Sequence, residues 1–347
     1  MKKHLPFLKI AGLSLLIMVF GQVFGQDKNE WLNKGNFYDS IGDYRKSIEC
    51  YTNVLKLDKG NPIALNNRSV AFVGIGKPGL ALVDLNALIY SNDAIADAFF
   101  NRYALHLEAG NYEFAMGDMN RYIDLSPNDM IALVLRAELA VNMEYYDVAI
   151  IDLVNVLKVK EDDIDLQIAL AEVFAKSNKL DSATNLLNRL SLKPNVNEEQ
   201  LYLVNALILS KSGNYKESNE KLNLFLLNKP KERGPLKLKA DNLFFLKEYE
   251  NALSLYKKMM ATDSADYALW ADIGHCYLQL ELYSEALDVL SKSVQKRNAQ
   301  PAYAYLGRGI AYFNLKKYNQ ACGDWQKSAL LGNAKAKEFL NAHCIKD

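Results

Sequence analysis

The sequence is poor in proline, cysteine and histidine, and it has no excess of charge of either sign. Among its 347 residues are 8 Pro, 18 Gly, 4 Cys and 4 His, and 41 Lys and Arg balance 41 Asp and Glu. The scarcity of proline and glycine and the lack of a long polar tract favour an ordered helical chain over a disordered one. A nucleic acid requires a basic stripe on its partner, so the balanced charge argues against a nucleic-acid-binding protein.

Catalytic and metal-binding patterns are also missing from the sequence. No pair of His or Cys residues has the spacing of metal ligands, no glycine-rich phosphate loop occurs, and no serine stands in a nucleophile elbow. Among the histidines after residue 25, we expect His106 to be a packed ring and His275 to lie on an inner surface. The sequence therefore predicts a protein that is not an enzyme and that has no cofactor and no metal.

The first 25 residues have the features of a secretory signal. Three lysines accompany an apolar run from Ile10 to about Phe24, and small residues follow at its end. The run of about 15 residues is short for a bilayer span, which needs about 20. We expect residues 1–25 to be cleaved, which leaves no membrane span and an exported, periplasmic chain. An uncleaved membrane anchor formed by residues 10–24 is the alternative.

The rest of the chain repeats with a period of about 34 residues, marked by tyrosine. The series is Tyr44, Tyr112, Tyr146, Tyr215, Tyr249, Tyr283 and Tyr318, with Pro78 and Leu180 at two further places. A fixed period of this length predicts a stacked array, and three- and four-residue apolar steps predict a helix, a turn and a second helix in each repeat. The nine repeats start near Lys28, Pro62, Ala96, Met130, Ile164, Glu199, Arg233, Tyr267 and Ala302.

Small and large residues alternate in these repeats at fixed places. The eighth place holds Gly, Ala or Ser, as at Gly35 and Ala137, and the twentieth holds Ala or Ser, so the two helices can approach closely; large residues fill the space between repeats. This pattern resembles the tetratricopeptide repeat family from about Lys28 to the end. The resemblance implies an all-α, right-handed solenoid of about nine hairpins over residues 26–347, with a C-terminal capping helix in residues 333–347.

Two places depart from the regular repeat. Tyr103 puts a bulky ring at the small eighth place, and we expect that repeat to splay or tilt. Pro230 and Pro235 flank the junction between the sixth and seventh repeats. Because proline disfavours helix in the preceding residue, a hinge there is one interpretation and an ordinary turn is the other.

Four arginines are each followed by an aspartate 16 residues later. In the fifth and eighth repeats both places are apolar instead, so charge accompanies charge. We infer a direct ion pair across each hairpin, because a partly buried arginine needs a hydrogen-bonded partner. Four ligand-binding arginines are the alternative. The pairs are Arg68 with Asp84, Arg102 with Asp118, Arg136 with Asp152, and Arg308 with Asp324.

The four cysteines differ in what they predict. Cys50 and Cys276 are far apart in the array and should stay single. Cys322 and Cys344 lie on either side of the turn at Gly332, at similar distances from it. Antiparallel helices would place them at the same level, and an exported protein can form disulfides. We predict a disulfide there; two buried thiols are the alternative.

The resemblance also implies where a partner binds, because first helices line the concave face of such arrays. Acidic Glu108, Glu138 and Glu172 precede basic Lys176, Lys211 and Lys237, and a peptide with complementary charge order could lie along them; a merely solvated face is the alternative. The complete set of inward residues that we expect to bind is Asn36, Asn66, Phe100, Glu108, Glu138, Glu172, Lys176, Lys211, Lys237, Asp241, Phe244 and His275.

One known binding mode of the family is excluded at the N-terminal end. Some members grip a C-terminal carboxylate with cations and asparagines from three consecutive repeats. The matching places here hold Leu32, Asn36, Asn67, Asp97 and Asn101, so the cations are absent. We therefore expect a non-catalytic scaffold that binds a protein or peptide in its groove. A structural component of an envelope assembly, or an accessory protein with a carbohydrate-related partner that stacks on aromatic residues, is the alternative.

Overall fold

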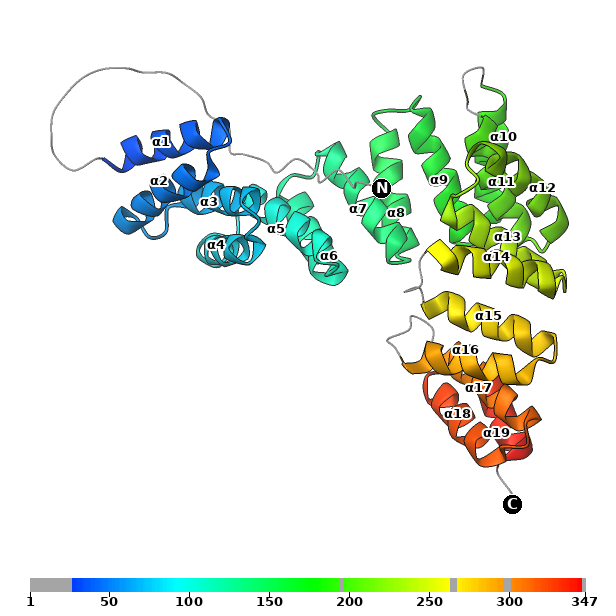
Figure 1. Ribbon diagram of the computed structural model, residues 1–347. Helices are drawn as coiled ribbons and strands as arrows, with labels where there is room; N and C mark the ends of the chain where they lie inside the picture. The colour runs from blue at the N-terminus through cyan, green and yellow to red at the C-terminus, as the bar shows by residue number, and fades with distance from the viewer. Residues whose placement is uncertain (1–26, 194–195, 197, 263–266, 296–300, 345–347) are drawn as a thin grey trace. The chain divides into compact units, whose positions relative to one another are not determined.

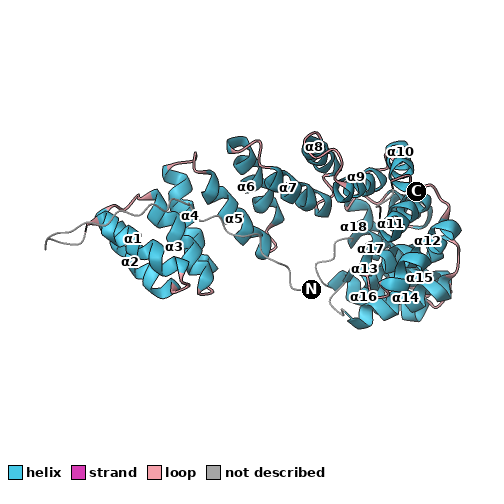
Figure 2. Cartoon of the chain, turned by 90° about the horizontal axis from the view of Figure 1, so that it is seen from above, coloured by secondary structure: helices cyan, strands magenta, loops and turns pink. Residues whose placement is uncertain are grey.

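A computed structural model describes residues 27–193, 196, 198–262, 267–295 and 301–344, which form nineteen helices and no strand. Figures 1 and 2 show these helices joined by short loops. The predicted signal peptide lies outside the described residues, and its cleavage stays a prediction. The chain divides into two compact units, Met1–Asp163 and Ile164–Asp347, each a stack of helical hairpins. The predicted all-α solenoid is confirmed for each unit, whereas one continuous superhelix stays a prediction.

Helix boundaries agree with the nine predicted repeats to within one residue at every start. Each second helix begins at the predicted tyrosine, or at Pro78 or Leu180. The N-terminal unit contains α1 (Lys28–Ser40), α2 (Tyr44–Leu57), α3 (Pro62–Gly74), α4 (Pro78–Ser91), α5 (Ala96–Glu108), α6 (Tyr112–Leu125), α7 (Met130–Asn142) and α8 (Tyr146–Leu157). The C-terminal unit contains α9 (Ile164–Lys176), α10 (Leu180–Ser191), α11 (Glu198–Lys211), α12 (Tyr215–Asn228), α13 (Arg233–Phe245), α14 (Tyr249–Thr262), α15 (Tyr267–Gln279), α16 (Tyr283–Gln295), α17 (Pro301–Asn314), α18 (Tyr318–Leu330) and α19 (Ala334–His343).

Every hairpin turn places its fifteenth residue in the left-handed backbone region. In the first turn Gly42 has φ 76°, and the N–H of Asp43 donates to the carbonyl of Tyr38. This six-residue bond closes the end of the first helix and satisfies a carbonyl that has no partner within the helix. Glycine occupies the place in four turns, and five turns use a residue with a side chain: Glu144, Asn178, Lys247, Glu281 and Lys316.

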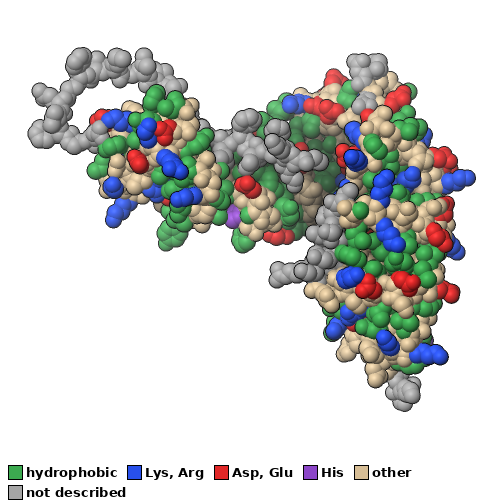
Figure 3. All heavy atoms as spheres, in the orientation of Figure 1, with side chains coloured by type: hydrophobic (Ala, Val, Ile, Leu, Met, Phe, Trp, Pro, Cys, Tyr) green, Lys and Arg blue, Asp and Glu red, His purple; other side chains and the backbone are tan. Residues whose placement is uncertain are grey.

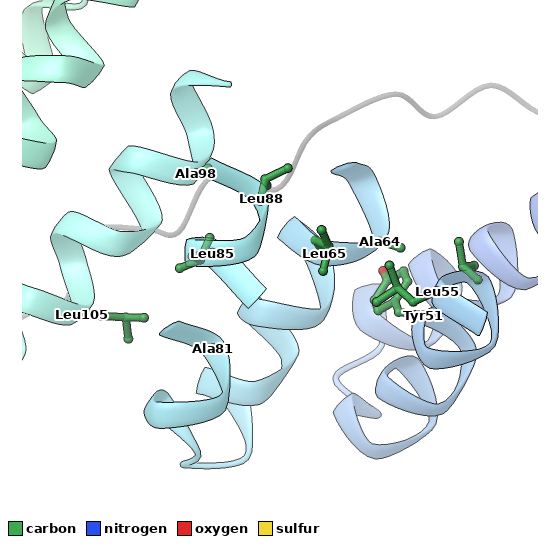
Figure 4. Close-up of a cluster of buried hydrophobic side chains, with 10 residues drawn as sticks. Tyr51, Leu55, Ala64, Leu65, Ala81, Leu85, Leu88, Ala98 and Leu105 are labelled. Atoms are coloured by element: carbon green, nitrogen blue, oxygen red, sulfur yellow. The ribbon is translucent and has the colours of Figure 1, made fainter. Parts of the chain in front are cut away.

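Close approach of the two helices in a hairpin depends on the eighth place. A Cβ added to Gly35 would lie 2.5 Å from Cε1 of Tyr51, so only glycine fits there. Tyr51 is fully buried in a core that continues through the first three hairpins (Figure 4). Tyr103 is also buried, and α5 and α6 pack as closely as the other hairpins do, so the hairpin does not splay as expected.

All four predicted arginine–aspartate pairs are present in the structure. In each pair the Nε and Nη2 of the arginine donate to the two carboxylate oxygens over 2.6–2.9 Å. In three repeats Nη1 donates to a residue of the preceding hairpin as well: Arg68 to Thr52, Arg102 to Asn86 and Arg136 to Asn120. Each of these arginines therefore ties three helices together, which favours the structural interpretation over the ligand-binding one.

The C-terminal end is closed by the predicted capping helix and by a disulfide. Cys322 of α18 and Cys344 at the end of α19 are bonded, with their Cα atoms 5.7 Å apart. The ring of Phe339 stacks on Trp325 at 4.9 Å between centroids, and Trp325 is fully buried. Cys50 and Cys276 are buried free thiols, as the spacing predicts.

The junction between the sixth and seventh repeats is an ordinary turn and not a hinge. Pro235 is buried in the first turn of α13, where proline costs no intrahelical hydrogen bond. Helices α12 and α13 pack against each other across this junction. The division between compact units falls instead at Asp163 and Ile164, where no proline marks it.

Candidate functional site

Successive hairpins of the C-terminal unit form a cleft of ≈ 370 Å³. Helix α13 supplies most of its lining, and α14, α15 and α17 supply one residue each. The predicted groove residues Lys237, Asp241 and Phe244 meet here. The full lining is Lys237, Asp241, Phe244, Phe245, Tyr256, Asp272 and Tyr303.

A lysine held between two carboxylates is the charged centre of the cleft. The Nζ of Lys237 lies 2.5 Å from Asp241 and 3.1 Å from Asp272, and 5.2 Å from the centroid of the Tyr256 ring. Burial alone would lower the pKa of Lys237, but the carboxylates of Asp272 and Asp241 outweigh it and raise this pKa. The ammonium group therefore stays charged and fixed, which makes it an orienting group and a poor base.

Tyr256 secures the same aspartate from below. Its hydroxyl donates to Oδ1 of Asp241 over 2.5 Å, and its ring is almost fully buried. Burial raises the pKa of Tyr256 strongly, and the charge of Asp241 raises it further. The hydroxyl is therefore a permanent hydrogen-bond donor, and it cannot serve as a nucleophile near neutral pH.

Aromatic rings form the apolar part of the cleft. Phe245 is 60% exposed and stacks on Tyr215 with centroids 5.0 Å apart. Phe244 packs edge-on against Phe245 at 6.1 Å and against Tyr249 at 5.3 Å. These neighbours hold an exposed ring in one place, which is the property expected of an anchor for a ligand side chain.

His275 does not face the groove as predicted, because it is buried behind the cleft. Its ring stacks on Tyr303 with centroids 3.6 Å apart, and its Nε2 lies 3.1 Å from the backbone carbonyl oxygen of Tyr303. Burial lowers the pKa of His275 to about 4, so it is neutral and fixes the position of Tyr303. A Cβ on Gly307 would lie 2.8 Å from Nε2 of His275, so the glycine leaves room for this ring.

The predicted groove of the N-terminal unit consists of asparagines that bond mainly to one another. The Nδ2 of Asn101 donates to Asn66, that of Asn66 to Asn67, and that of Asn67 to Asn36. Tyr51 also donates to Asn36, over 2.9 Å. Asn36 is exposed, whereas Asn66 is buried, so Asn66 supports the surface and was wrongly expected to form it.

Phe100 is the second correction in this unit. It is buried at 3% exposure, and its ring packs against Tyr122 at 5.1 Å and Tyr103 at 6.0 Å. A ring in this position contributes to the core and offers no face for a sugar. Glu108 and Glu138 are exposed, as expected.

The predicted order of an acidic stretch followed by a basic one is also wrong in its central part. Glu172 and Lys176 form an ion pair with each other, with 2.7 Å between Oε1 and Nζ, and Lys237 is paired with two aspartates. Lys211 is exposed. Pairing within a helix explains both cases, because residues four apart are neighbours on its surface. In the view of Figure 3, basic and acidic side chains are interspersed over the C-terminal unit.

Tyr303, Asp272 and Tyr256 were missed from sequence although the cleft depends on them. Tyr303 occupies the second, inward place of its repeat, which was a usable signal. Tyr256 occupies a place that fills space between hairpins, and only the structure places its hydroxyl next to Asp241. Asp272 meets Lys237 because α15 lies beside α13 across a hairpin, which no spacing within one repeat reveals.

Comparison with known proteins gives the identity of the fold. Sequence profiles described as "Tetratricopeptide repeat" match residues 31–61, within the first hairpin, and residues 246–310, which include α14–α16. The chain belongs to the tetratricopeptide repeat family. The predicted resemblance is thereby confirmed; the profiles do not address whether this tetratricopeptide repeat protein is exported or bacterial.

Relatives of this tetratricopeptide repeat protein are longer than it. Human "Sperm-associated antigen 1" is 25% identical over 279 residues, which are 79% of this chain and 29% of that protein. Human "DnaJ homolog subfamily C member 3" is 23% identical over 325 residues, 85% of this chain and 63% of that protein. The chain therefore spans less than a third of the first of these relatives.

Solved structures agree on the fold. A human IFIT1 dimer with m7Gppp-AAAA aligns with a TM-score of 0.60 at 10% identity, over 92% of this chain and 81% of that one. Within the described residues, no helix is long and apolar enough to cross a bilayer. The same residues contain no group of three His, Cys, Asp or Glu side chains that could hold a metal ion.

Proposed function

We propose that this protein is a non-catalytic scaffold that binds an extended segment of a partner protein in the cleft of its C-terminal unit. The observation that carries the proposal is the arrangement of Lys237 between Asp241 and Asp272, next to the exposed ring of Phe245. Binding sites combine apolar area with a few fixed polar groups that set the orientation of the ligand. This cleft contains both before any ligand arrives.

The charges of the cleft favour a peptide over a nucleic acid. Lys237 is neutralised by two carboxylates, so it offers no free cation to a phosphate. Nucleic-acid binding draws most of its affinity from phosphate contacts to Lys and Arg. A peptide backbone has both donors and acceptors, and it can bond to the carboxylates and to the ammonium group at once.

Export to the periplasm is part of the proposal. It is supported by the apolar N-terminal run and by the bond between Cys322 and Cys344, because disulfides persist in oxidising compartments and are rare in the cytosol. Mass spectrometry of the mature N-terminus tests it. Cleavage near residue 25 is the expected result, and an intact Met1 on a membrane-bound chain would favour the anchor formed by residues 10–24.

Photo-crosslinking tests the position of the partner. A benzophenone amino acid at Phe245, which is 60% exposed, should capture one partner, and the same group at Ile151, which is 57% exposed on α8, should not. Adding Asp241→Asn should remove the Phe245 adduct, because Lys237 and Tyr256 both lose their charged partner. Equal adducts at both positions, or an adduct that survives Asp241→Asn, would contradict binding in the cleft.

The competing function is a structural role in an envelope assembly through second helices. Several of these helices expose apolar side chains, including Val83 at 62% on α4 and Ile151 at 57% on α8. An adduct from Ile151 alone would support this role. The carbohydrate-related role has less support, because Phe100 is buried and only Phe244 and Phe245 remain near a surface.

A further inference from the structure

A second cleft lies in the N-terminal unit, far from any first-helix groove residue in the repeat pattern. It is formed by the turn between α5 and α6 and the turn between α7 and α8, and has a volume of ≈ 490 Å³. Its aromatic lining is unusually exposed: Tyr112 is 45%, Phe114 69% and Tyr145 43% exposed. The other lining residues are Gly110, Asn111, Glu113, Asn142 and Met143.

The repeat architecture does not require these rings. The place of Phe114 holds Lys46, Ser182, Glu217, Asn251, Glu285 and Gln320 in six other repeats. The place of Tyr145, immediately before the second helix, holds polar residues in seven of the eight other repeats. An exposed phenylalanine is costly to keep in water, and here three rings share one cleft.

Contacts around the cleft hold the rings in place. Phe114 stacks on His106 with centroids 5.3 Å apart. The hydroxyl of Tyr145 donates to Oε1 of Glu113 over 3.0 Å. Glu144 precedes Tyr145 at φ 61°, a left-handed conformation that sets the direction in which the chain enters α8. The rings therefore form a preformed surface that needs little ordering to bind.

The charge around this cleft is of one sign. Residues 103–120 and 137–157 contain no lysine and no arginine. The neighbouring Arg102 and Arg136 are each held by an aspartate inside the hairpins. The acidic residues of the two segments outside these pairs are Glu108, Glu113, Glu138, Glu144 and Asp147.

We propose that this turn-edge cleft binds a basic side chain, Arg or Lys, of a partner protein. A cation over an aromatic face is attracted by the negative charge of the ring face, and the guanidinium group also stacks on such rings. The carboxylate of Glu113 retains acceptor capacity after accepting the Tyr145 hydroxyl, because an ionised carboxylate offers about four lone-pair sites. Aromatic surface, a carboxylate and the absence of competing cations occur together here, independently of the cleft proposed above to bind the partner's main segment.

Nuclear magnetic resonance of the full chain with two matched small probes tests the proposal. N-acetyl-arginine methylamide carries the proposed group, and N-acetyl-norleucine methylamide is an uncharged probe of comparable chain length. The arginine probe should shift the amide resonances of Gly110, Glu113 and Tyr145, and the norleucine probe should shift them much less. The equivalent turn at Gly213 should not respond to either probe.

Two variants separate a specific site from general attraction to acidic surface. Phe114→Ser should weaken the arginine probe by roughly fivefold through the loss of one cation–aromatic contact. Phe37→Ser, at a phenylalanine that is 59% exposed elsewhere in the same unit, should leave its binding unchanged. Equal shifts from both probes, equal effects of both variants, or no shift at the cleft would each overturn the proposal; none of these results bears on crosslinking at Phe245.

Discussion

Side-chain pairs 16 residues apart carry much of the packing inside each hairpin. Gly35 is covered by Tyr51, Gly274 by Leu290, and Arg68 is bonded to Asp84 at one place earlier. These pairs could be predicted from sequence because both members lie in one repeat and vary together. In the fifth repeat, Leu170 and Leu186 replace the ion pair, so the same position accepts either chemistry.

Replacement of both members of the Arg102–Asp118 pair should be tolerated better than replacement of one. Asp118→Leu leaves the buried guanidinium group without its carboxylate and should cost about 3–5 kcal/mol of unfolding free energy. Arg102→Leu with Asp118→Leu should recover most of that loss, because it restores the arrangement of the fifth repeat. Chemical denaturation of the three proteins measures the coupling, and a double variant no more stable than Asp118→Leu would contradict it.

Asp39 should make stability depend on pH. It is 7% exposed, and burial raises its pKa to about 6, with Ser47 offsetting part of the rise. The folded state therefore holds the Asp39 proton over a range where the unfolded chain has lost it, and the contribution of Asp39 to stability falls as pH rises from about 4 to about 6. Asp39→Asn should flatten this part of the pH profile. A profile equal to that of the parent protein would show that the group does not titrate there.

At the scale of elements, the turn between the two helices is the most regular feature of the hairpin. All nine turns use a left-handed residue at the same place, and five of them use a residue with a Cβ. Helix bounds could be predicted from the tyrosine period, because the tyrosine lies two residues after this turn residue. The turn conformation itself was not predicted, because glycine marks it in only four repeats.

Glycine at such a turn should stabilise the protein. A side-chain residue in the left-handed region costs about 1 kcal/mol relative to glycine. Glu281→Gly should therefore raise the unfolding free energy by up to about 1 kcal/mol, and Gly42→Ala should lower it by a similar amount. Thermal unfolding of both variants checks the pair of effects. Destabilisation by Glu281→Gly would indicate that the Glu281 side chain makes a contact worth more than the backbone relief.

At the scale of the whole molecule, the candidate sites were harder to predict than the fold. Lys237, Asp241 and Phe244 were expected in a groove and do line the cleft, but Asp272 and Tyr303 reach them from later repeats. Their meeting depends on how each hairpin is rotated on the one before it. Phe100 and His275 were misplaced for the same reason, since a small rotation of a helix decides whether an inward place is exposed or buried.

Removal of the disulfide should loosen the C-terminal cap before the rest of the array. Chain-entropy arguments give roughly 3 kcal/mol for a loop of this length. Cys322→Ser with Cys344→Ser should speed amide exchange in α19 and around Trp325 while exchange in the N-terminal unit stays unchanged. Exchange that accelerates equally in both units would instead mean that the array unfolds as one cooperative body.

The position of the disulfide also bears on how the chain could acquire its one native bond among four thiols. Cys322 and Cys344 are 22 residues apart, whereas Cys276 is 46 residues from Cys322 and Cys50 is 226 residues from Cys276. Loop closure disfavours the longest of these pairings against the native one by roughly thirtyfold. Hairpins built from local contacts form early and bury Cys50 and Cys276 in their own repeats. Oxidation would thus reach the correct pair through chain proximity and shielding, without a need for an isomerase to correct mispaired chains.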